Sequence, residues 1–519
     1  MRKLPLGIHT FHRLREDECV YVDKTQHAYN LITRGYRYFL SRPRRFGKSL
    51  FVSTLEEILS GNKKLFDGLW IAQSDYQWKP HGVIKLDFSG VPGEDAQQFK
   101  KGLKHALIKI AQEYELIIDT SPDEPETVFD NVVSALHKKF GRVAVLVDEY
   151  DSPILRSLKD YDRAVKIRSV IQNFFTVIKS LDAQINFVFI TGVSSFVRAG
   201  LFSGINNLTI ITLDENFVGI CGYTDGEIDH YFSDYLEWWA EHKQIPYEQL
   251  RSDIRTWYDG YHFGDNVLPV YNPFSLMHAL GGEVFKNFWF QSGMATFLVE
   301  ILKQQHADFD PEKLEIDEDS LERFDIGSTP LMALMFQTGY LTIKSYDFAR
   351  KRYTLDYPNQ EVKDSLQIYL FEVFARIDHD QAQQITGKLY DVLADGDIDE
   401  IIMVIKKLFA HVPYQLHMKE EKFYHALLQM ACTATGIKAQ SEYSTSHGSI
   451  DLVLDLPKIL YVVEIKFNKP AQEALDQIKL RRYYEPFLVQ QKPIVLLGLA
   501  FKREPSVFDV TYVVENLQK

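Results

Sequence analysis

Cysteine, long apolar runs and positive charge are all scarce in this sequence. Its three cysteines, Cys19, Cys221 and Cys432, lie far apart and form no C-x-x-C pair, which excludes a disulfide framework or a zinc cluster. No apolar run approaches the roughly 18 residues of a membrane span, and residues 1–17 lack the apolar stretch of a signal peptide. We therefore expect a protein of the reducing cytoplasm without membrane contact.

The charge balance is acidic, with 58 Lys and Arg against 71 Asp and Glu and a net charge of -13. Such a chain does not coat nucleic acid through bulk positive charge, so any contact with nucleic acid needs a local basic patch. Hydrophobic residues (45%) and charged residues (25%) are close to globular averages, which excludes a disordered or fibrous chain. At about 100 to 200 residues per domain, the 519 residues predict about three domains.

Short apolar strands alternate with helical patterns over residues 1–290, which predicts an α/β domain with a mostly parallel sheet. The pattern over 291–410 is mainly helical and predicts a helical connector. Residues 411–519 return to strands and helices and predict a second, smaller α/β domain. The predicted strands are 36–40, 83–88, 143–147 and 186–191 in the first domain, and 450–456, 459–466 and 494–499 in the last.

A loop with the sequence SRPRRFGKS, residues 41–49, follows the first predicted strand and precedes an amphipathic helix over 50–59. A loop at a helix N-terminus presents backbone N–H groups and a positive dipole end to phosphate. Lys48 would reach the β- and γ-phosphates of a nucleotide, and the Ser49 hydroxyl would bind Mg²⁺. Because Arg42 stands where the full motif has its first glycine, the loop alone leaves the site undecided. The nucleotide-binding residues predicted here are Arg44, Arg45, Phe46, Gly47, Lys48, Ser49 and Leu50.

Two further strands end in polar residues that could complete this site. The strand 143–147 runs into Asp148 and Glu149, where the first carboxylate would hold Mg²⁺ and the second would polarise the attacking water. An Asp-Glu pair can also simply begin a helix, but the GKS loop earlier in the same domain favours a nucleotide site. Thr191 ends the strand 186–191 and could contact the γ-phosphate, although helix capping explains its hydroxyl equally well.

These segments together resemble the AAA-ATPase-like family, which forms the N-terminal part of many bacterial two-domain proteins. The resemblance is carried by LPLGIHTFHRLREDECVYVDKT, YFLSRPRRFGKSLFVSTL, VLVDEYDSPI and FVFITGVSSF, and it covers roughly residues 3–280. It implies a P-loop NTPase domain that binds and hydrolyses ATP, with Lys48, Ser49, Asp148 and Glu149 in the usual roles. In this family SRPRRFGKS is the usual phosphate loop, without the first glycine.

The resemblance leaves several contacts open. Arg44, Arg45 or Arg198 could neutralise phosphate charge, and Arg198 can equally be a solvated loop residue. The segment WYDGYHF, residues 257–263, and the nearby VYNPFSL have two interpretations. One is a tight turn with core aromatic residues; the other, by resemblance, is a lid that packs near the nucleotide, with His262 as a candidate contact.

The last domain carries a second group of charged residues, on two paired strands. Side chains on a strand alternate between its faces, so Glu464 and Lys466 point the same way while their apolar neighbours enter the core. Asp451 in the preceding strand can close onto Glu464, and two carboxylates with a backbone carbonyl suit Mg²⁺ or Mn²⁺. Lys466 could orient or deprotonate water, and Gln477 and Arg481 lie on the following helix. An isolated Glu-x-Lys would instead be a surface ion pair, which the apolar flanks oppose.

The set Asp451, Glu464, Lys466 and Gln477 resembles the PD-(D/E)XK nuclease superfamily, over roughly residues 415–519. The resemblance implies a restriction-endonuclease-like α/β fold in which these four residues are catalytic and the two carboxylates bind the metal.

Two features of this domain stay open. Ser449 stands where the superfamily pattern has a basic residue, so one phosphate contact is missing. His425, on the helix before the strands, could face the metal or belong to the core.

The leading hypothesis is an ATP-binding and ATP-hydrolysing protein whose nuclease domain cuts phosphodiester bonds in DNA under nucleotide control. The expected cofactors are ATP and Mg²⁺, with Mn²⁺ as the other metal; RNA is not excluded as substrate, and an oligomer is compatible with the sequence. The alternative is a nucleotide-dependent binding or signalling module with a non-cleaving nuclease-like domain, favoured by the acidic net charge and by Ser449. A kinase-like phosphotransferase has only the P-loop in its support, because Asp148 and Glu149 suit water activation better.

Overall fold

The computed structural model divides into two compact units, unit 1 over Met1–Val362 and unit 2 over Lys363–Lys519. The boundary lies inside the segment 291–410 that the sequence predicts as a connector, and the three-part division stays a prediction. The structure describes residues 1–93, 95–196, 200–202, 204–205, 207–265, 268–291, 314–323, 325–326, 330–375, 377–411, 421–445, 448–490, 492–504 and 507–517.

Unit 1 is built around a parallel sheet of five strands in the order β2-β3-β4-β1-β5. Its four long strands coincide with the four predicted from apolar runs, which confirms the predicted α/β fold. Because β4 lies between β1 and β3, the carboxyl ends of these three strands are neighbours at one edge of the sheet. The strands are β1 (Arg37–Ser41), β2 (Gly82–Asp87), β3 (Val143–Asp148), β4 (Ile185–Gly192) and β5 (Thr209–Ile210).

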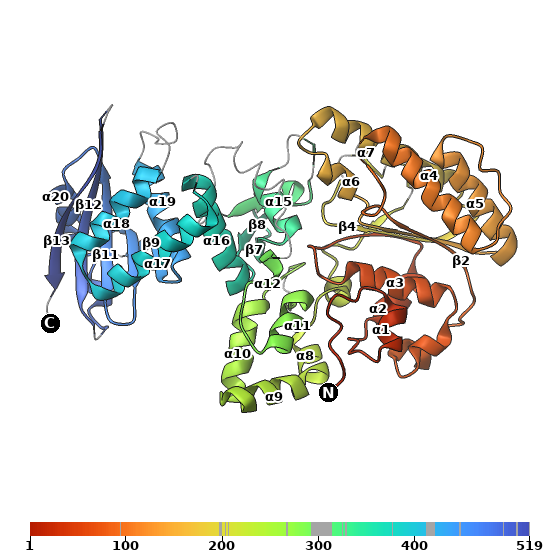
Figure 1. Cartoon of the computed structure of the whole chain (residues 1–519), viewed down its shortest axis with the longest axis horizontal. Helices are drawn as coiled ribbons and strands as arrows, with labels where there is room; N and C mark the ends of the chain where they lie inside the picture. Colours follow the sequence, from red (N-terminus) through yellow and green to blue (C-terminus); the bar gives the residue numbers. More distant parts are fainter. Residues whose placement is uncertain are drawn as a thin grey trace. The chain divides into compact units, whose positions relative to one another are not determined.

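Helices cover both faces of this sheet (Figure 1). Helices α4, α5 and α7 pack together on one face, and α1, α2 and α3 lie on the other. Burial from both sides explains the continuous apolar runs, since every residue of β3 is buried. The helices are α1 (Phe11–Glu16), α2 (Thr25–Arg34), α3 (Lys48–Leu59), α4 (Ala96–Glu113), α5 (Pro125–Phe140), α6 (Ser152–Arg156) and α7 (Tyr161–Ser180).

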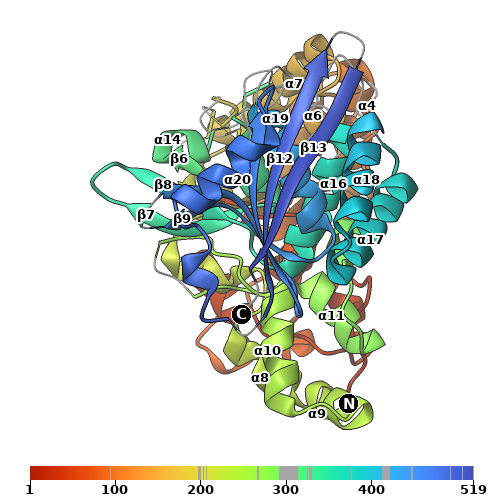
Figure 2. The same ribbon diagram turned by 90° about the vertical axis from the view of Figure 1, so that its left-hand side faces the viewer.

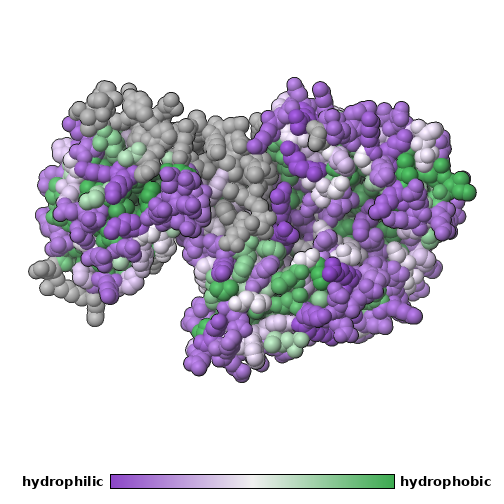
Figure 3. Space-filling model, viewed as in Figure 1, coloured by the Kyte–Doolittle hydropathy of each residue, from purple (hydrophilic) through white to green (hydrophobic). Residues whose placement is uncertain are grey.

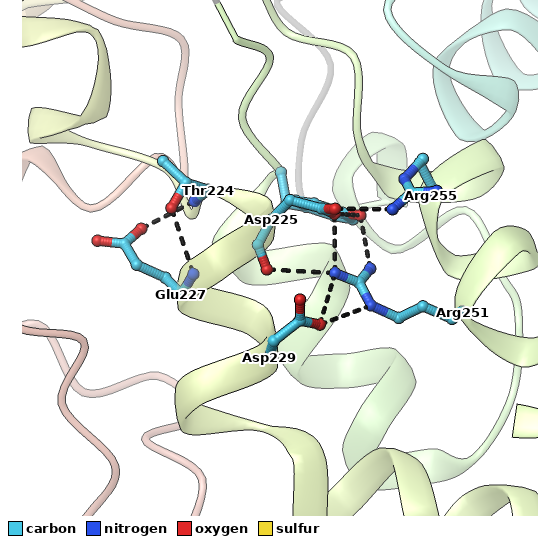
Figure 4. A network of polar contacts seen from close by, with 7 residues as sticks. Thr224, Asp225, Glu227, Asp229, Arg251 and Arg255 are labelled. Atoms are coloured by element: carbon cyan, nitrogen blue, oxygen red, sulfur yellow. Dashed lines mark hydrogen bonds and ion pairs between the residues drawn. The ribbon is translucent and has the colours of Figure 1, made fainter. Parts of the chain in front are cut away.

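Helices α8 to α11 follow the sheet and contribute to a separate apolar core. Helix α8 begins with a capping box, in which Thr224 and Glu227 accept each other's backbone N–H groups. Arg251 of α10 joins α10 to α8, because its guanidinium donates to Asp225 at 2.8 Å and to Asp229 at 3.0 Å (Figure 4). The helices are α8 (Asp225–Tyr231), α9 (Ser233–Lys243), α10 (Tyr247–Tyr258) and α11 (Pro273–Gly282).

The last part of unit 1 contains a three-stranded antiparallel sheet in the order β6-β8-β7. It lies within the segment predicted as mainly helical; strand β7 reads TIKSYD, with too few apolar residues to signal a strand. The elements are α12 (Phe288–Gln291), β6 (Glu315–Asp317), α14 (Glu318–Leu321), α15 (Leu331–Thr338), β7 (Thr342–Asp347) and β8 (Arg352–Asp356). Helix α16 (Gln360–Ala375) crosses the boundary between the units, and α17 (His379–Asp395) and α18 (Ile398–His411) belong to unit 2.

Unit 2 contains a mixed sheet of five strands in the order β13-β12-β11-β10-β9, in which only β11 and β12 pair in parallel. Helix α20 packs closely on this sheet: a Cβ at Gly498 of β12 would lie 2.6 Å from the Ala471 carbonyl oxygen. Figure 2 shows β12 and β13 as long neighbouring strands. The elements are α19 (Glu421–Ala434), β9 (Lys438–Thr445), β10 (Gly448–Asp455), β11 (Leu460–Phe467), α20 (Ala471–Leu480), β12 (Ile494–Glu504) and β13 (Val507–Leu517).

The surface of the described residues is mostly hydrophilic, because the apolar side chains are largely buried. Hydrophilic side chains cover most of the face shown in Figure 3, with smaller apolar patches between them. Within the described residues, no helix is both long enough and apolar enough to cross a membrane.

Candidate nucleotide and nuclease sites

The phosphate loop joins the end of β1 to the start of α3. Gly47 caps α3 with a φ of 90°, in the left-handed region that favours glycine. Lys48 begins the helix and folds back over the loop, where its Nζ donates to the carbonyl oxygens of Arg42 and Pro43 at 2.9 Å each. Burial lowers the pKa of Lys48, and the charges of Glu149 and Asp148 oppose that shift. The ammonium group is therefore held over the loop by two of the loop's own carbonyl oxygens.

Arg42 explains how the loop forms without its first glycine. Arg42 is 1% exposed, and its guanidinium donates to the carbonyl oxygens of Ser41 at 3.0 Å and Thr212 at 2.7 Å. It also lies 4.1 Å from the ring centroid of Phe263. Burial lowers the pKa of Arg42 to about 10, so it remains charged at neutral pH. Arg42 is thus an anchor that fixes the loop to a distant segment.

The other loop residues predicted to bind nucleotide differ in what they present. Arg44 and Arg45 are exposed, and the Arg45 guanidinium lies 5.0 Å from the ring centroid of Phe274. Phe46 is fully buried against the rings of Tyr261 and Phe263, so only its backbone could meet a phosphate. Leu50 follows in the first turn of α3 and is half-buried. Arg198 lies outside the described residues.

Asp148 and Glu149 stand at the end of β3, as the sequence predicts. Burial raises the pKa of Asp148, whereas a hydrogen bond from Ser49 and the charge of Lys48 lower it. Burial also raises the pKa of Glu149, which adopts a φ of 46°. Asp87, at the end of β2, is paired in register with Asp148; the sequence analysis did not predict it as a site residue. Its signal was its place at the end of the predicted strand 83–88.

Thr191 is the last residue but one of β4, and its carbonyl oxygen accepts from the Tyr150 backbone N–H at 3.1 Å. It is completely buried, and its hydroxyl has no hydrogen-bond partner among the described residues. The following residues are held by Asp151, whose Oδ2 accepts from the backbone N–H groups of Val193 at 3.1 Å and Ser194 at 2.6 Å. The sequence analysis did not predict Asp151 as part of the site, although its closeness in sequence to Asp148 could have indicated it. Ser195 N–H donates to the side-chain oxygen of Gln337 in α15 at 2.9 Å.

His262, the candidate nucleotide contact of the 257–263 turn, forms hydrogen bonds with other residues of unit 1. Its backbone N–H donates to the Thr342 hydroxyl at 2.7 Å, and its Nδ1 lies 3.1 Å from the Gly260 carbonyl oxygen. Burial lowers the pKa of His262. These contacts describe a tight turn with a packed histidine.

The second site lies where β10 and β11 pair. Leu452 faces Val463 in the antiparallel register, so Asp451 and Glu464 are brought together. The Asp451 carboxylate accepts from the Ile465 backbone N–H at 2.7 Å. His425 of α19 contacts the backbone of Asp451: its Nε2 lies 2.6 Å from the Asp451 carbonyl oxygen.

Glu464 is the centre of this site. It is 1% exposed; its Oε1 accepts from Lys466 Nζ at 3.1 Å and from the Gln477 amide of α20. Burial, followed by the negative charge of Asp451, raises the pKa of Glu464 to about 7, and Lys466 opposes this shift. A pair this buried is not a surface ion pair, so that alternative is wrong.

The donor set suits a hard divalent cation. Within the described part of the chain, no group of three or more His, Cys, Asp or Glu side chains is arranged to hold a metal. The site instead offers two carboxylates and the Ile465 carbonyl oxygen, which accepts from Lys466 Nζ at 3.0 Å. The Glu464 Oε2 is buried and has no hydrogen-bond partner in the described residues, so this oxygen could bind a cation. The residues therefore fit Mg²⁺ or Mn²⁺.

Basic residues gather on α20 and just after it, at Lys479, Arg481 and Arg482, and Lys479 and Arg482 are paired with carboxylates. Lys479 pairs with Glu515 at 2.8 Å, and Arg482 lies 3.3 Å from Glu485. Arg481 is exposed at the C-terminal end of α20. Because two of these positive charges are paired with glutamates, they are only weak support for an anionic substrate.

Comparison with known proteins agrees with both sites. The family description "Predicted AAA-ATPase" matches residues 5–202, and the "PD-(D/E)XK nuclease superfamily" matches residues 419–509. The chain belongs to the AAA-ATPase-like proteins that carry a C-terminal PD-(D/E)XK nuclease superfamily domain. These domain families indicate nucleotide-linked nuclease activity.

Two individual proteins are similar to this chain. An "Uncharacterized protein in vnfD 5'region" of Azotobacter chroococcum mcd 1 is 38% identical over 530 residues, which cover 99% of each chain. Among solved structures, the Aeropyrum pernix ORC1 protein in complex with DNA is 9% identical, with a TM-score of 0.25, over 69% of this chain and 91% of that one. A likeness at that level carries no argument about fold or ligand.

Proposed function

We propose that this protein binds and hydrolyses ATP and that its C-terminal domain is a Mg²⁺-dependent nuclease that cuts DNA under nucleotide control. The observation that carries the proposal is the buried Glu464 carboxylate. One of its oxygens is held by Lys466 and Gln477, and the other has no hydrogen-bond partner among the described residues. A carboxylate placed in this way beside Asp451 is costly unless a cation uses it.

In the ATP site, the chain's own residues divide the work. The α3 N-terminus and Lys48 would hold the phosphates, and Lys48 would exchange its two loop carbonyls for phosphate oxygens. Ser49 and Asp148 would hold Mg²⁺, which neutralises phosphate charge when bound. The Thr191 hydroxyl, which has no hydrogen-bond partner among the described residues, would donate to the γ-phosphate, and Glu149 would orient the attacking water.

In the nuclease site, Asp451, Glu464 and the Ile465 carbonyl would hold the metal. The metal, when bound, supplies positive charge to the phosphodiester and acidifies water. Lys466 would leave Glu464 and turn its ammonium group to the substrate phosphate or the attacking water. Gln477 would keep Glu464 in place through its amide.

The test uses plasmid and linear DNA with the purified full chain, Mg²⁺ or Mn²⁺, and ATP present or absent. We expect wild type to cut, Asp451→Ala to leave DNA intact, and Lys48→Ala to lose ATP binding and any response to ATP. A matched RNA substrate decides between the two nucleic acids. Equal DNA integrity with wild type and Asp451→Ala under every condition contradicts the nuclease assignment. DNA binding without cutting would instead support the non-cleaving binding module.

A further inference from the structure

The phosphate loop has a hydrogen-bond partner on α12. Trp289 is 6% exposed, and its indole Nε1 donates to the Arg44 carbonyl oxygen at 3.1 Å. Its ring meets that of Tyr340 edge-on, with centroids 5.2 Å apart. The two carbonyls before that of Arg44 are the ones that Lys48 occupies. A nucleotide that draws Lys48 away therefore releases the loop next to the carbonyl that Trp289 holds.

The same tryptophan is bound from the other side by Glu361. The Trp289 backbone N–H donates to Glu361 Oε1 at 2.6 Å. Glu361 is completely buried, and its other carboxylate oxygen, Oε2, has no hydrogen-bond partner among the described residues. Glu361 is the second residue of α16, and the boundary between the two units follows at Val362. One tryptophan thus contacts both the phosphate loop and the first turn of the helix that continues into unit 2.

The start of α16 is held firmly in unit 1. The Asn359 side chain donates to the Asp259 carbonyl oxygen at 3.0 Å and accepts from the Val362 backbone N–H at 3.1 Å. Gly260 has a φ of 98°, and a Cβ there would lie 1.9 Å from the Pro358 carbonyl oxygen. These residues belong to the 257–263 turn and to the chain just before α16. Contacts this close move together, because packed backbone cannot deform freely.

We propose that Trp289 and Glu361 are positioning residues that join the phosphate loop to the first turn of α16, so that nucleotide binding in unit 1 changes the helix that continues into unit 2. The inference rests on the proposed function, because it names the route by which ATP would control the nuclease domain. The route is built from hydrogen bonds that connect Arg44 to Trp289 and Trp289 to Glu361. Both members have defined partners that single substitutions can remove.

Trp289→Phe is the sharpest test, because it keeps an aromatic ring against Tyr340 and removes the indole donor to Arg44. The matched control is Trp238→Phe, which removes an exposed indole donor, the one that bonds Glu283 at 2.9 Å. ATP binding is measured by calorimetry, and exchange of the α16 backbone amides with deuterated water is measured with and without ATP. DNA cleavage is measured with and without ATP on the same proteins.

We expect ATP to change exchange of the α16 amides by about fivefold or more in wild type and Trp238→Phe, the lower end of usual allosteric couplings. In Trp289→Phe, ATP should still bind, but the exchange ratio and the effect of ATP on cleavage should both fall to about one. Glu361→Gln, which keeps an acceptor for the Trp289 N–H but loses the charge, should lie between the two.

Two outcomes would overturn the relay. One is wild-type protein that binds ATP while exchange in α16 stays the same; the other is Trp289→Phe or Glu361→Gln with an undiminished ATP effect. Should Trp289→Phe fail to fold, Glu361→Gln carries the same test. A protein that binds no ATP or cuts no DNA contradicts the proposed function instead, and the calorimetry and cleavage controls separate that failure from failure of the relay.

Discussion

The Asp151 carboxylate accepts two hydrogen bonds from Ser194. Its Oδ2 accepts from the Ser194 backbone N–H at 2.6 Å and from the Ser194 hydroxyl. Gly192 leaves no room for a side chain here, because a Cβ would lie 2.5 Å from the other Asp151 oxygen. Burial raises the pKa of Asp151, and the bonds from Ser194 oppose that shift. The position of the backbone after Thr191 therefore depends on one buried carboxylate.

Asp151→Ala should lower the free energy of unfolding of unit 1 by about 2 kcal/mol, because it leaves buried donors without an acceptor. All six tryptophans lie in unit 1, so tryptophan fluorescence during urea denaturation follows this change. ATP hydrolysis should fall by about 10- to 100-fold through misplacement of the loop. Asp95→Ala, which removes an exposed N-cap from α4, should cost about 1 kcal/mol and leave hydrolysis unchanged. Equal hydrolysis by both variants would contradict a positioning role.

Thr191→Val should separate catalysis from stability. The buried hydroxyl has no hydrogen-bond partner among the described residues, so replacing it with a methyl group should raise the free energy of unfolding or leave it unchanged. Loss of a donor to the γ-phosphate should lower kcat for ATP by roughly 100-fold. The control is Thr386→Val, which removes a hydroxyl bonded to the Ala382 carbonyl oxygen at 2.9 Å and should cost about 1 kcal/mol without affecting hydrolysis. An unchanged kcat in Thr191→Val would contradict the γ-phosphate contact and show that Thr191 serves only the core.

Glu361 should make stability depend on pH. Burial raises its pKa to about 7, above the roughly 4.3 of an unfolded chain. Between these values the unfolded carboxyl is ionised first, so the free energy of unfolding falls as pH rises and levels off above the folded pKa. Relative to Glu361→Gln, wild type should lose roughly 2–3 kcal/mol between about pH 5 and about pH 8. Parallel pH profiles for the two proteins would contradict this, and the exposed Glu237→Gln serves as control.

Two glycines of unit 2 should respond to alanine in opposite directions. A Cβ at Gly498 would meet the Ala471 carbonyl oxygen at 2.6 Å and the Leu475 nitrogen at 2.8 Å, so Gly498→Ala should destabilise unit 2 by about 3 kcal/mol. Gly387 lies inside α17 with nothing within 4 Å of such a Cβ, so Gly387→Ala should stabilise it by up to about 1 kcal/mol. Deuterium exchange of the α20 and α17 amides measures both. If both substitutions changed the stability of unit 2 in the same direction, the close contact between Gly498 and α20 would be refuted.

Gln477 should matter for cutting and little for folding. Gln477→Ala removes the amide that bonds Glu464, so we expect DNA cleavage to fall by about 100-fold at limiting Mg²⁺. Part of that loss should return at high Mg²⁺, because a less well-held carboxylate binds the metal more weakly. Gln472→Ala, which removes an exposed amide from the same helix, should cleave like wild type. Equal cleavage by the two variants would show that Gln477 does not support the site.

The four long strands of the first sheet and β10, β11 and β12 of unit 2 were predictable because a buried strand needs a local run of apolar residues. The long strand β13 (Val507–Leu517) was not predicted, because polar residues interrupt its apolar ones. The acidic pairs were predictable for a related reason: Asp148 and Glu149 end an apolar strand, and Glu464 interrupts one. Strand β9, with the sequence KAQSEYST, was missed because a polar edge strand leaves no such run. The sheet β6-β8-β7 was missed for a similar reason.

The sequence by itself determined the α/β class and pointed to the candidate phosphate loop, since apolar periodicity and short motifs are local properties of the chain. A family resemblance added the four residues of the candidate nuclease site. Only the tertiary structure decided that Arg42 anchors the loop to Thr212 and that Trp289 connects Arg44 with Glu361. It also decided that Glu464 is buried with one oxygen that has no hydrogen-bond partner among the described residues. These contacts join residues far apart in the chain. Folding brings them together through burial of the whole core, which no local pattern records.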